Sequence, residues 1–158
     1  MTERTTNRIR QAAAITAALA IATFCYWSWP REPNVGGCAT VDEHAELIAT
    51  ACDAPTAVYR LARHTRTTHG CPSGDYLAVP RRGGRHHSGS LGCYTLSVHA
   101  GDCLNGHGTT IRRVPCTTAA DLRVDAVLTD EHDKHTCPDP PRSVTYSDPT
   151  TTICLSKP

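Results

Sequence analysis

"AGDCLNGHGTTIRRVPCTTAAD", residues 100–121, contains two cysteines on either side of the turn-forming sequence "NGHG". A second stretch of the same design, "VGGCATVDEHAELIATACDAP", occupies residues 35–55. Cys116 lies 13 positions after Cys103, and Cys52 lies 14 positions after Cys38. Two segments that share this pattern within one chain predict an internal duplication.

The remaining cysteines extend the duplication. The third cysteine of each copy is followed by a proline and then by a tyrosine, Tyr76 or Tyr146. We therefore predict a first four-cysteine module over residues 35–98 and a second over residues 99–158. The equivalent cysteines are offset by between 61 and 66 positions: Cys38, Cys52, Cys71 and Cys93 in the first copy, and Cys103, Cys116, Cys137 and Cys154 in the second.

Short β-prone runs separated by turns predict that both modules are all-β. In the second copy, "GDCL" leads through "NGHG" into "TTIRRVPC" as an antiparallel hairpin, and "LRVDAVL", "SVTY" and "TTICL" follow. The first copy repeats the plan with "ELIATAC", "VYRLA", "YLAV" and "LGCYTL". The fold class we expect is two small tandem β modules after an N-terminal transmembrane helix.

The composition predicts that disulfides hold these modules together. Residues 31–158 contain no Phe, Trp or Met, so apolar packing alone is a weak source of stability. Eight cysteines in a small exported chain are typical of a disulfide framework. Bonds confined to each copy, in the same pattern, leave three possible pairings. The near-constant spacing across the hairpin turn favours the first cysteine with the second, and the third with the fourth: Cys38–Cys52, Cys71–Cys93, Cys103–Cys116 and Cys137–Cys154.

The N-terminal segment predicts a membrane anchor. Residues 12–29 carry no charge, three arginines precede them, and as a helix they span about 27 Å, close to the hydrocarbon thickness. The arginines predict a cytoplasmic head over residues 1–11, and a linker over residues 30–34 leads to extracytoplasmic modules. We thus expect a single-pass protein of the cell membrane. The alternative is a cleavable signal peptide, with Ala20 and Ala22 as the small-residue site.

One family shares these motifs. The order "GDCL", "VPC", a strand with a basic residue, "CP", a tyrosine and "CL" resembles the four-cysteine domain of actinobacterial exported proteins of the LppU-like group. "GDC" and "VPC" are also more weakly similar to the septum formation domain of the same bacteria. The resemblance covers nearly all of residues 35–158 as two copies. In the first copy Gly37 and Ala39 replace the Asp and the Leu, and "TAC" replaces "VPC". It implies an exported cell-envelope protein and transfers no catalytic residue.

The loop "PRRGGRHHSGS", residues 80–90, is the best candidate for a binding surface, because its arginines and histidines attract anionic groups. It would suit anionic lipid headgroups, an anionic envelope polymer or an acidic envelope protein as a partner, but the interpretation that the sequence favours is a flexible, solvated insertion. The candidate residues are Arg81, Arg82, Arg85, His86 and His87.

Other chemistry receives little support from the sequence. Three histidine groups, His86–His87, His64 with His69, and His132 with His135, lack the thiolate or carboxylate partners that indicate a metal site, so we expect no metal and no cofactor. Asp102 is expected to accept a hydrogen bond in a turn rather than to act as an acid. A net charge of +1 does not favour a nucleic-acid binder. No motif for a nucleophile or a phosphate loop is present, and we expect no enzyme.

The sequence therefore predicts a membrane-anchored, extracytoplasmic and non-catalytic binding or scaffolding protein of the bacterial cell envelope. The alternative is a secreted, cleaved protein whose paired disulfide modules bind a ligand or inhibit a partner.

Overall fold

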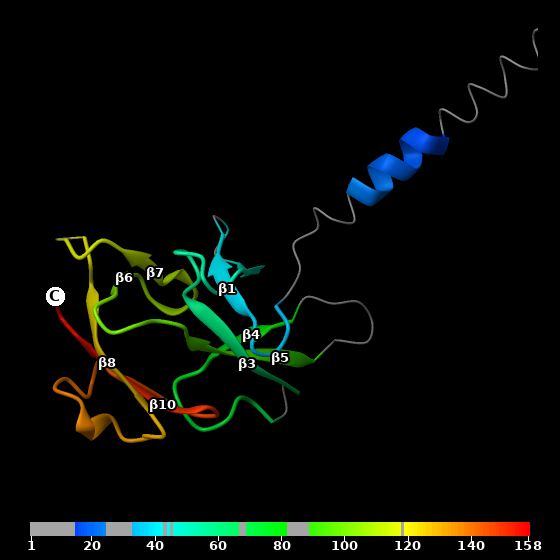
Figure 1. The fold of residues 1–158 in the computed structure, drawn as a ribbon. Helices are drawn as coiled ribbons and strands as arrows, with labels where there is room; N and C mark the ends of the chain where they lie inside the picture. Colours follow the sequence, from blue (N-terminus) through cyan, green and yellow to red (C-terminus); the bar gives the residue numbers. More distant parts are fainter. Residues whose placement is uncertain are drawn as a thin grey trace, which may run out of the picture. The chain divides into compact units, whose positions relative to one another are not determined.

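The computed structural model describes the chain in several ranges: residues 15–24, 33–42, 44, 46–66, 69–81, 89–117 and 119–158. Residues 15–24 form a helix, drawn in blue in Figure 1. The transmembrane helix predicted over residues 12–29 thus lies partly outside the described residues, as do the predicted head (1–11) and most of the predicted linker (30–34). Within the described part, no helix is long and apolar enough to cross a membrane.

Glu32–Pro158 is one compact unit that contains two five-stranded antiparallel sheets (Figure 1). The first sheet has the strand order β2-β1-β3-β5-β4. Its strands are β1 (Cys38–Val41), β2 (Leu47–Thr50), β3 (Tyr59–Arg66), β4 (Leu77–Pro80) and β5 (Ser90–Leu96).

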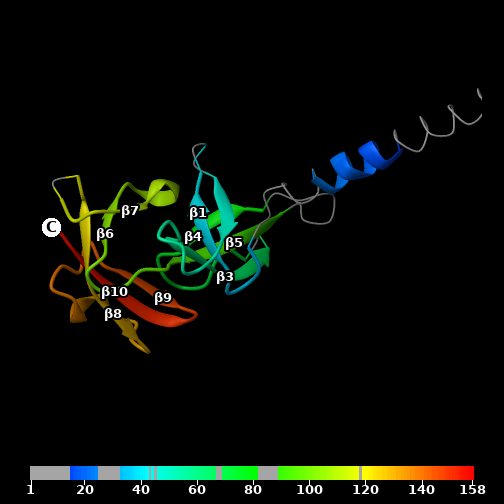
Figure 2. The same cartoon turned by 45° about the horizontal axis from the view of Figure 1, so that its top comes forward.

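The second sheet repeats this order as β7-β6-β8-β10-β9, and Figure 2 shows the two sheets as separate groups of strands, the first mainly cyan and green, the second mainly yellow and red. Its strands are β6 (Cys103–Asn105), β7 (Arg112–Val114), β8 (Leu122–Thr129), β9 (Val144–Ser147) and β10 (Thr150–Ser156). Two 3-10 turns, η1 (Gly108–Thr110) and η2 (Lys134–Thr136), lie between these strands. The predicted all-β class is confirmed, and the shared strand order supports the duplication.

The register matches residue by residue. Each sheet has a bulge, and the two bulges fall at the same place. In β3, Ala62 has no partner between the residues that pair with Tyr94 and Cys93. In β8, Asp125 has no partner between the residues that pair with Leu155 and Cys154. A bulge changes which face the following side chains occupy, so two chance folds would not share its position. The register makes Cys93 equivalent to Cys154.

Four disulfides join the strands in the pairing that the sequence favours. Cys38–Cys52 and Cys103–Cys116 each cross the first hairpin of a repeat, with Cα atoms 5.0 and 5.1 Å apart. Cys71–Cys93 and Cys137–Cys154 tie the segment before the fourth strand to the fifth. Each bond closes a loop of 13 to 22 residues and is worth about 3 kcal/mol in the chain-entropy model.

The buried side chains of both sheets form a single hydrophobic cluster. Its members are mostly aliphatic or tyrosine: Ala39, Val58, Tyr59, Leu61, Tyr94, Val98, Leu104, Val124, Tyr146, Ile153 and Leu155. Since residues from both repeats contribute, each sheet buries part of its apolar face with help from the other.

Tyr76 and Tyr146 both follow a third cysteine, but the register does not make them equivalent. Val79 pairs with Gly92 and Val144 with Ile153, one residue before the last cysteine of each repeat. Tyr76 lies before the first of these valines, whereas Tyr146 lies after the second. The two rings contact each other edge to face, with centroids 5.1 Å apart. The tyrosines therefore join the repeats.

Candidate functional site

Basic side chains collect at one end of the first sheet. β3 ends there at Arg66, which pairs with Ser90 at the start of β5. The Arg81 amide, just after β4, donates a hydrogen bond to the Ser90 carbonyl at 3.1 Å. The turn after β3 also lies there, with the His69 amide donating to the Arg66 carbonyl at 3.0 Å. We call this region the basic end and define it by Arg63, His64, Arg66, His69 and Arg81.

The predicted binding loop begins and ends at the basic end. Arg81 is described and half-buried. The other predicted loop residues, Arg82, Arg85, His86 and His87, lie outside the described residues. The Arg81 amide and the Ser90 carbonyl, which flank these residues, are joined at the same sheet end as Arg66.

The charge of this region is strongly one-sided. Between Asp53 and Asp102 the sequence has six arginines and one acidic residue, Asp75, which gives 6 − 1 = +5. Residues 102–158 have six Lys and Arg against eight Asp and Glu, which gives 6 − 8 = −2. The near-zero net charge of the whole chain therefore includes a basic segment between Asp53 and Asp102, although the whole first repeat, residues 35–98, has six arginines against five acidic residues, which gives 6 − 5 = +1.

The second repeat provides an internal comparison, because the register assigns a counterpart to each β3 residue. Arg63 pairs with Cys93, and Ala126 with the equivalent Cys154. Arg66 pairs with Ser90, and Thr129 with Thr151. Neutral residues thus fill these positions in the second repeat, so the fold itself does not require arginines there.

A cavity of about 280 Å³ opens beside β3. Arg63 and Cys93 lie directly opposite each other on adjacent strands, so their side chains share one face of the sheet. The Cys71–Cys93 disulfide fixes Cys71, which lines the cavity, to that face. Typical small-molecule pockets begin at about 300 Å³, so this cavity suits one small group rather than a whole cofactor. It is lined by Arg63, His64, Thr65, His69, Gly70, Cys71 and Pro72.

The cavity brings together His64 and His69, which the sequence raised as possible metal ligands. Nowhere in the described ranges do three or more His, Cys, Asp or Glu side chains form a group that could hold a metal ion. Cys71 is occupied by its disulfide. The described donor set at the cavity therefore suits an anion better than a metal.

One acidic group of the second repeat reaches the basic end. Asp148, in the turn between β9 and β10, forms an ion pair with Arg63 at 3.5 Å. Both side chains are more than half exposed, at 58% and 52%, so the pair contributes at most about 1 kcal/mol. The backbone of Asp148 is held more firmly, because the Tyr76 hydroxyl donates to its carbonyl at 2.7 Å and accepts from its amide at 2.6 Å.

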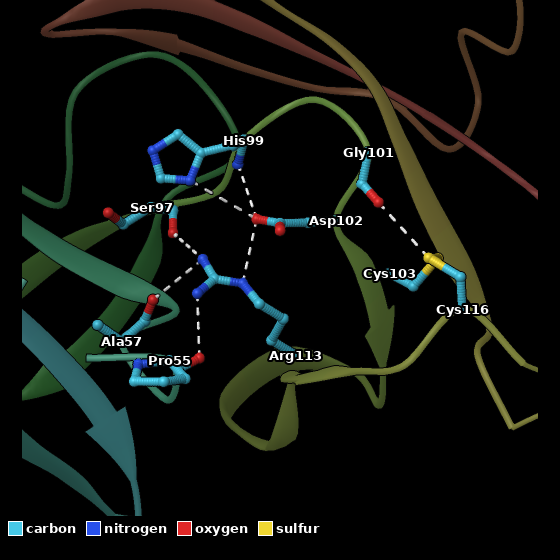
Figure 3. Close-up of polar contacts among 9 residues, drawn as sticks. All are labelled: Pro55, Ala57, Ser97, His99, Gly101, Asp102, Cys103, Arg113 and Cys116. Atoms are coloured by element: carbon cyan, nitrogen blue, oxygen red, sulfur yellow. Dashed lines mark hydrogen bonds and ion pairs between the residues drawn. A yellow bond between two sulfur atoms is a disulfide. The ribbon is translucent and has the colours of Figure 1, made fainter. Parts of the chain in front are cut away.

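A second polar cluster joins the repeats and is shown in Figure 3. Asp102 accepts a hydrogen bond from the His99 amide at 2.8 Å, which confirms its predicted role in a turn. Its carboxylate also lies 3.0 Å from Nε of Arg113. Asp102 and Arg113 both bind backbone groups, so the cluster holds the two repeats together.

The guanidinium of Arg113 points from the second repeat at three carbonyls that precede or follow strands of the first. It donates to Pro55 at 3.0 Å, to Ala57 at 3.4 Å and to Ser97 at 3.1 Å. A planar group with several donors suits such a junction, because it satisfies several acceptors at once.

No protein-family model, no curated protein and no solved structure matches the chain. The resemblance to the LppU-like group and to the septum formation domain therefore stays a prediction that depends on the quoted cysteine motifs.

Sequence reasoning singled out the loop, of which Arg81 alone among the candidate residues is described, and it missed the arginines of β3. Arg63 and Arg66 belong to a strand, and a strand arginine is ordinarily read as a solvated side chain. The signal that indicates them is the near absence of acidic residues between Asp53 and Asp102. The contact with Asp148 depends on chain segments far apart and leaves no local pattern.

Proposed function

We propose that this chain is a non-catalytic binding protein of the cell envelope, and that the basic end binds an anionic envelope polymer. The observation that carries the proposal is the +5 charge between Asp53 and Asp102, of which Arg63, Arg66 and Arg81 belong to the basic end. Neutral residues, Ala126 and Thr129, replace Arg63 and Arg66 in the second repeat. Such a field attracts polyanions and weakens as salt rises.

A soluble polymer fits this surface better than a lipid bilayer. Surfaces that enter a membrane interface combine basic residues with large exposed apolar ones. Among the described residues of the compact unit, Val35 is the one exposed large hydrophobic residue, and it lies outside the basic end. Recognition at the basic end is therefore electrostatic and polar.

The proposal includes the anchor over residues 12–29, with both repeats outside the cytoplasm. It is supported by the uncharged sequence of that segment and by the arginines before it. The four disulfides also support it, since they persist in oxidising compartments. Membranes washed with carbonate should retain the full chain. A product in the medium that starts near Thr23 would instead establish the secreted alternative.

The binding test uses the full chain in detergent micelles with fluorescent polyphosphate and polyglutamate as probes. The variant Arg63→Ala/Arg66→Thr gives both positions the neutral residues that the second repeat has there, Ala126 and Thr129. We expect its affinity to fall about tenfold, which is about 1.4 kcal/mol for two lost charge contacts.

The control Arg123→Ala/Arg142→Ala removes the same charge from exposed sites of the second repeat. Its affinity should change less than twofold. Equal losses in both variants would show a response to net charge alone, and binding by neither probe would overturn the proposal. Vesicles with anionic lipid form a further arm. Binding to them in preference to both soluble polymers would reject the polymer as the ligand.

A further inference from the structure

We infer that the cavity beside β3 binds a single oxyanion, a phosphate or carboxylate group, and that Asp148 of the second repeat competes with this group for Arg63. The inference deepens the proposed function and depends on it for the polymer that carries the oxyanion. It assigns Arg63 as the anchoring cation and Asp148 as the residue that limits affinity.

The cavity has the size and the charge for this role. Its volume of about 280 Å³ accommodates one small group, and Arg63 and His69 lie in its lining. A guanidinium presents paired donors that match the oxygens of a phosphate or carboxylate. Acidic residues are absent from the lining, which leaves Asp148 as the carboxylate that lies within ion-pair distance of Arg63 among the described residues.

Asp148 is placed where an incoming oxyanion has to compete with it. Its carboxylate lies 3.5 Å from the Arg63 guanidinium. Tyr76, from the first repeat, holds the Asp148 backbone through two hydrogen bonds of 2.7 and 2.6 Å. The carboxylate thus stays beside Arg63 without being buried, because more than half of its side chain is exposed.

The strength of this pair makes displacement feasible. An exposed ion pair contributes about 0.2–1 kcal/mol, whereas charge-assisted bidentate contacts are stronger. A ligand oxyanion can therefore replace Asp148 at a small cost. The same estimate sets the size of the effect, because removing the competing charge should tighten binding by no more than about fivefold.

The second repeat has different residue types at the positions equivalent to Arg63 and Thr65. Ala126 replaces Arg63 in the register, and Leu128 replaces Thr65. Arg63 and Thr65, which line the cavity, thus belong to the first repeat, while the competing carboxylate comes from the second. Duplication gives one repeat the binding residue and the other the residue that moderates it.

The test measures amide chemical shifts of the full chain in micelles during titration with inorganic phosphate and, separately, with acetate. We expect the amides of Thr65 and Gly70 to move, since both residues line the cavity. Asp148→Asn should tighten binding two- to fivefold, and Arg63→Ala should abolish these shifts. Asp139→Asn is the matched control, because Asp139 pairs with Arg142 within the second repeat.

The outcomes separate the two proposals. Polymer binding without shifts at Thr65 and Gly70 leaves the basic end as the binding surface and overturns the cavity. Shifts from phosphate or acetate without polymer binding retain the cavity and overturn the proposed function. If Asp148→Asn leaves the affinity unchanged or weakens it, the competing role of Asp148 is wrong. The probe with the larger shifts identifies the oxyanion.

Discussion

The Tyr59 hydroxyl donates a hydrogen bond to the Gly108 carbonyl at 2.5 Å, and the two residues belong to different repeats. The same hydroxyl accepts from the Ile111 amide at 3.2 Å. Tyr146 makes the reciprocal contact, because its hydroxyl accepts from the Leu96 amide of the first repeat at 3.2 Å. Each repeat thus places a buried tyrosine against the backbone of the other.

Tyr59→Phe should destabilise the compact unit by about 1–3 kcal/mol, because the Gly108 carbonyl and the Ile111 amide lose their partner. Denaturant unfolding followed by circular dichroism measures this change. Tyr76→Phe is the comparison, since its hydroxyl bonds are exposed and water replaces them. A loss of stability for Tyr59→Phe no larger than that for Tyr76→Phe would contradict the claim that the Tyr59 hydroxyl stabilises the contact between the repeats.

Burial gives the same tyrosine a pH signature. Desolvation raises the pKa of Tyr59 to about 12, with the Ile111 hydrogen bond opposing the rise, and burial also raises the pKa of Tyr146. In the unfolded chain tyrosine ionises near pH 10. A raised folded pKa means that the neutral form is favoured by folding, so this stability is complete below about pH 10 and is lost as the pH rises toward 12.

Unfolding free energies measured at about pH 8 and about pH 11 test this sign. Stability should fall between the two values, and it should fall less in Tyr59→Phe. A rise in stability over this interval, or an equal fall in the variant, would show that Tyr59 is not the responsible group.

Arg113 is the second joint between the repeats. Arg113→Ala removes donors from the carbonyls of Pro55, Ala57 and Ser97 and leaves Asp102 without its cation. We expect a loss of about 2–3 kcal/mol in unfolding free energy. The double variant with Asp102→Ala should lose less than the sum of the single variants, because both act through one network. Strict additivity would disprove the coupling.

Gly74 lets a segment of the first repeat lie against the edge of β9. It forms a bridge with Tyr146, and an added Cβ would come within 2.4 Å of the Thr145 carbonyl oxygen. Its φ of +133° is also unfavourable for other residues. Gly74→Ala should therefore cost more stability than Gly36→Ala, where φ is +83° but the space for a Cβ is open. Similar losses for both variants would show that the close approach is unimportant.

The strands were predictable because each is a local pattern. All but the first residue of "VYRLA" lies in β3, "LRVDAVL" lies in β8, and the "NGHG" turn lies between β6 and β7 as expected. Cysteine spacing also favoured the observed pairing, since the first two cysteines flank a hairpin. Sequence position alone misled at Tyr76 and Tyr146, where a shared order after the third cysteine concealed a direct contact.

The joints and the cavity were not predictable in the same way. Tyr59 contacts residues about fifty positions away, and Arg63 meets Asp148 across an even longer separation. Such contacts depend on how the two sheets pack against each other, and the alternation of polar and apolar residues along a strand does not predict that packing. The loop arginines were visible because all three lie within residues 81–85, whereas the strand arginines stand out only when the register shows their neutral counterparts.

Disulfide mapping of the native protein tests the central claim most directly, because the duplicated fold and its extracytoplasmic location both depend on it. Non-reducing digestion and mass spectrometry of protein from intact cells should recover Cys38–Cys52, Cys71–Cys93, Cys103–Cys116 and Cys137–Cys154. Free thiols at these eight positions, or bonds that link one repeat to the other, would contradict the account.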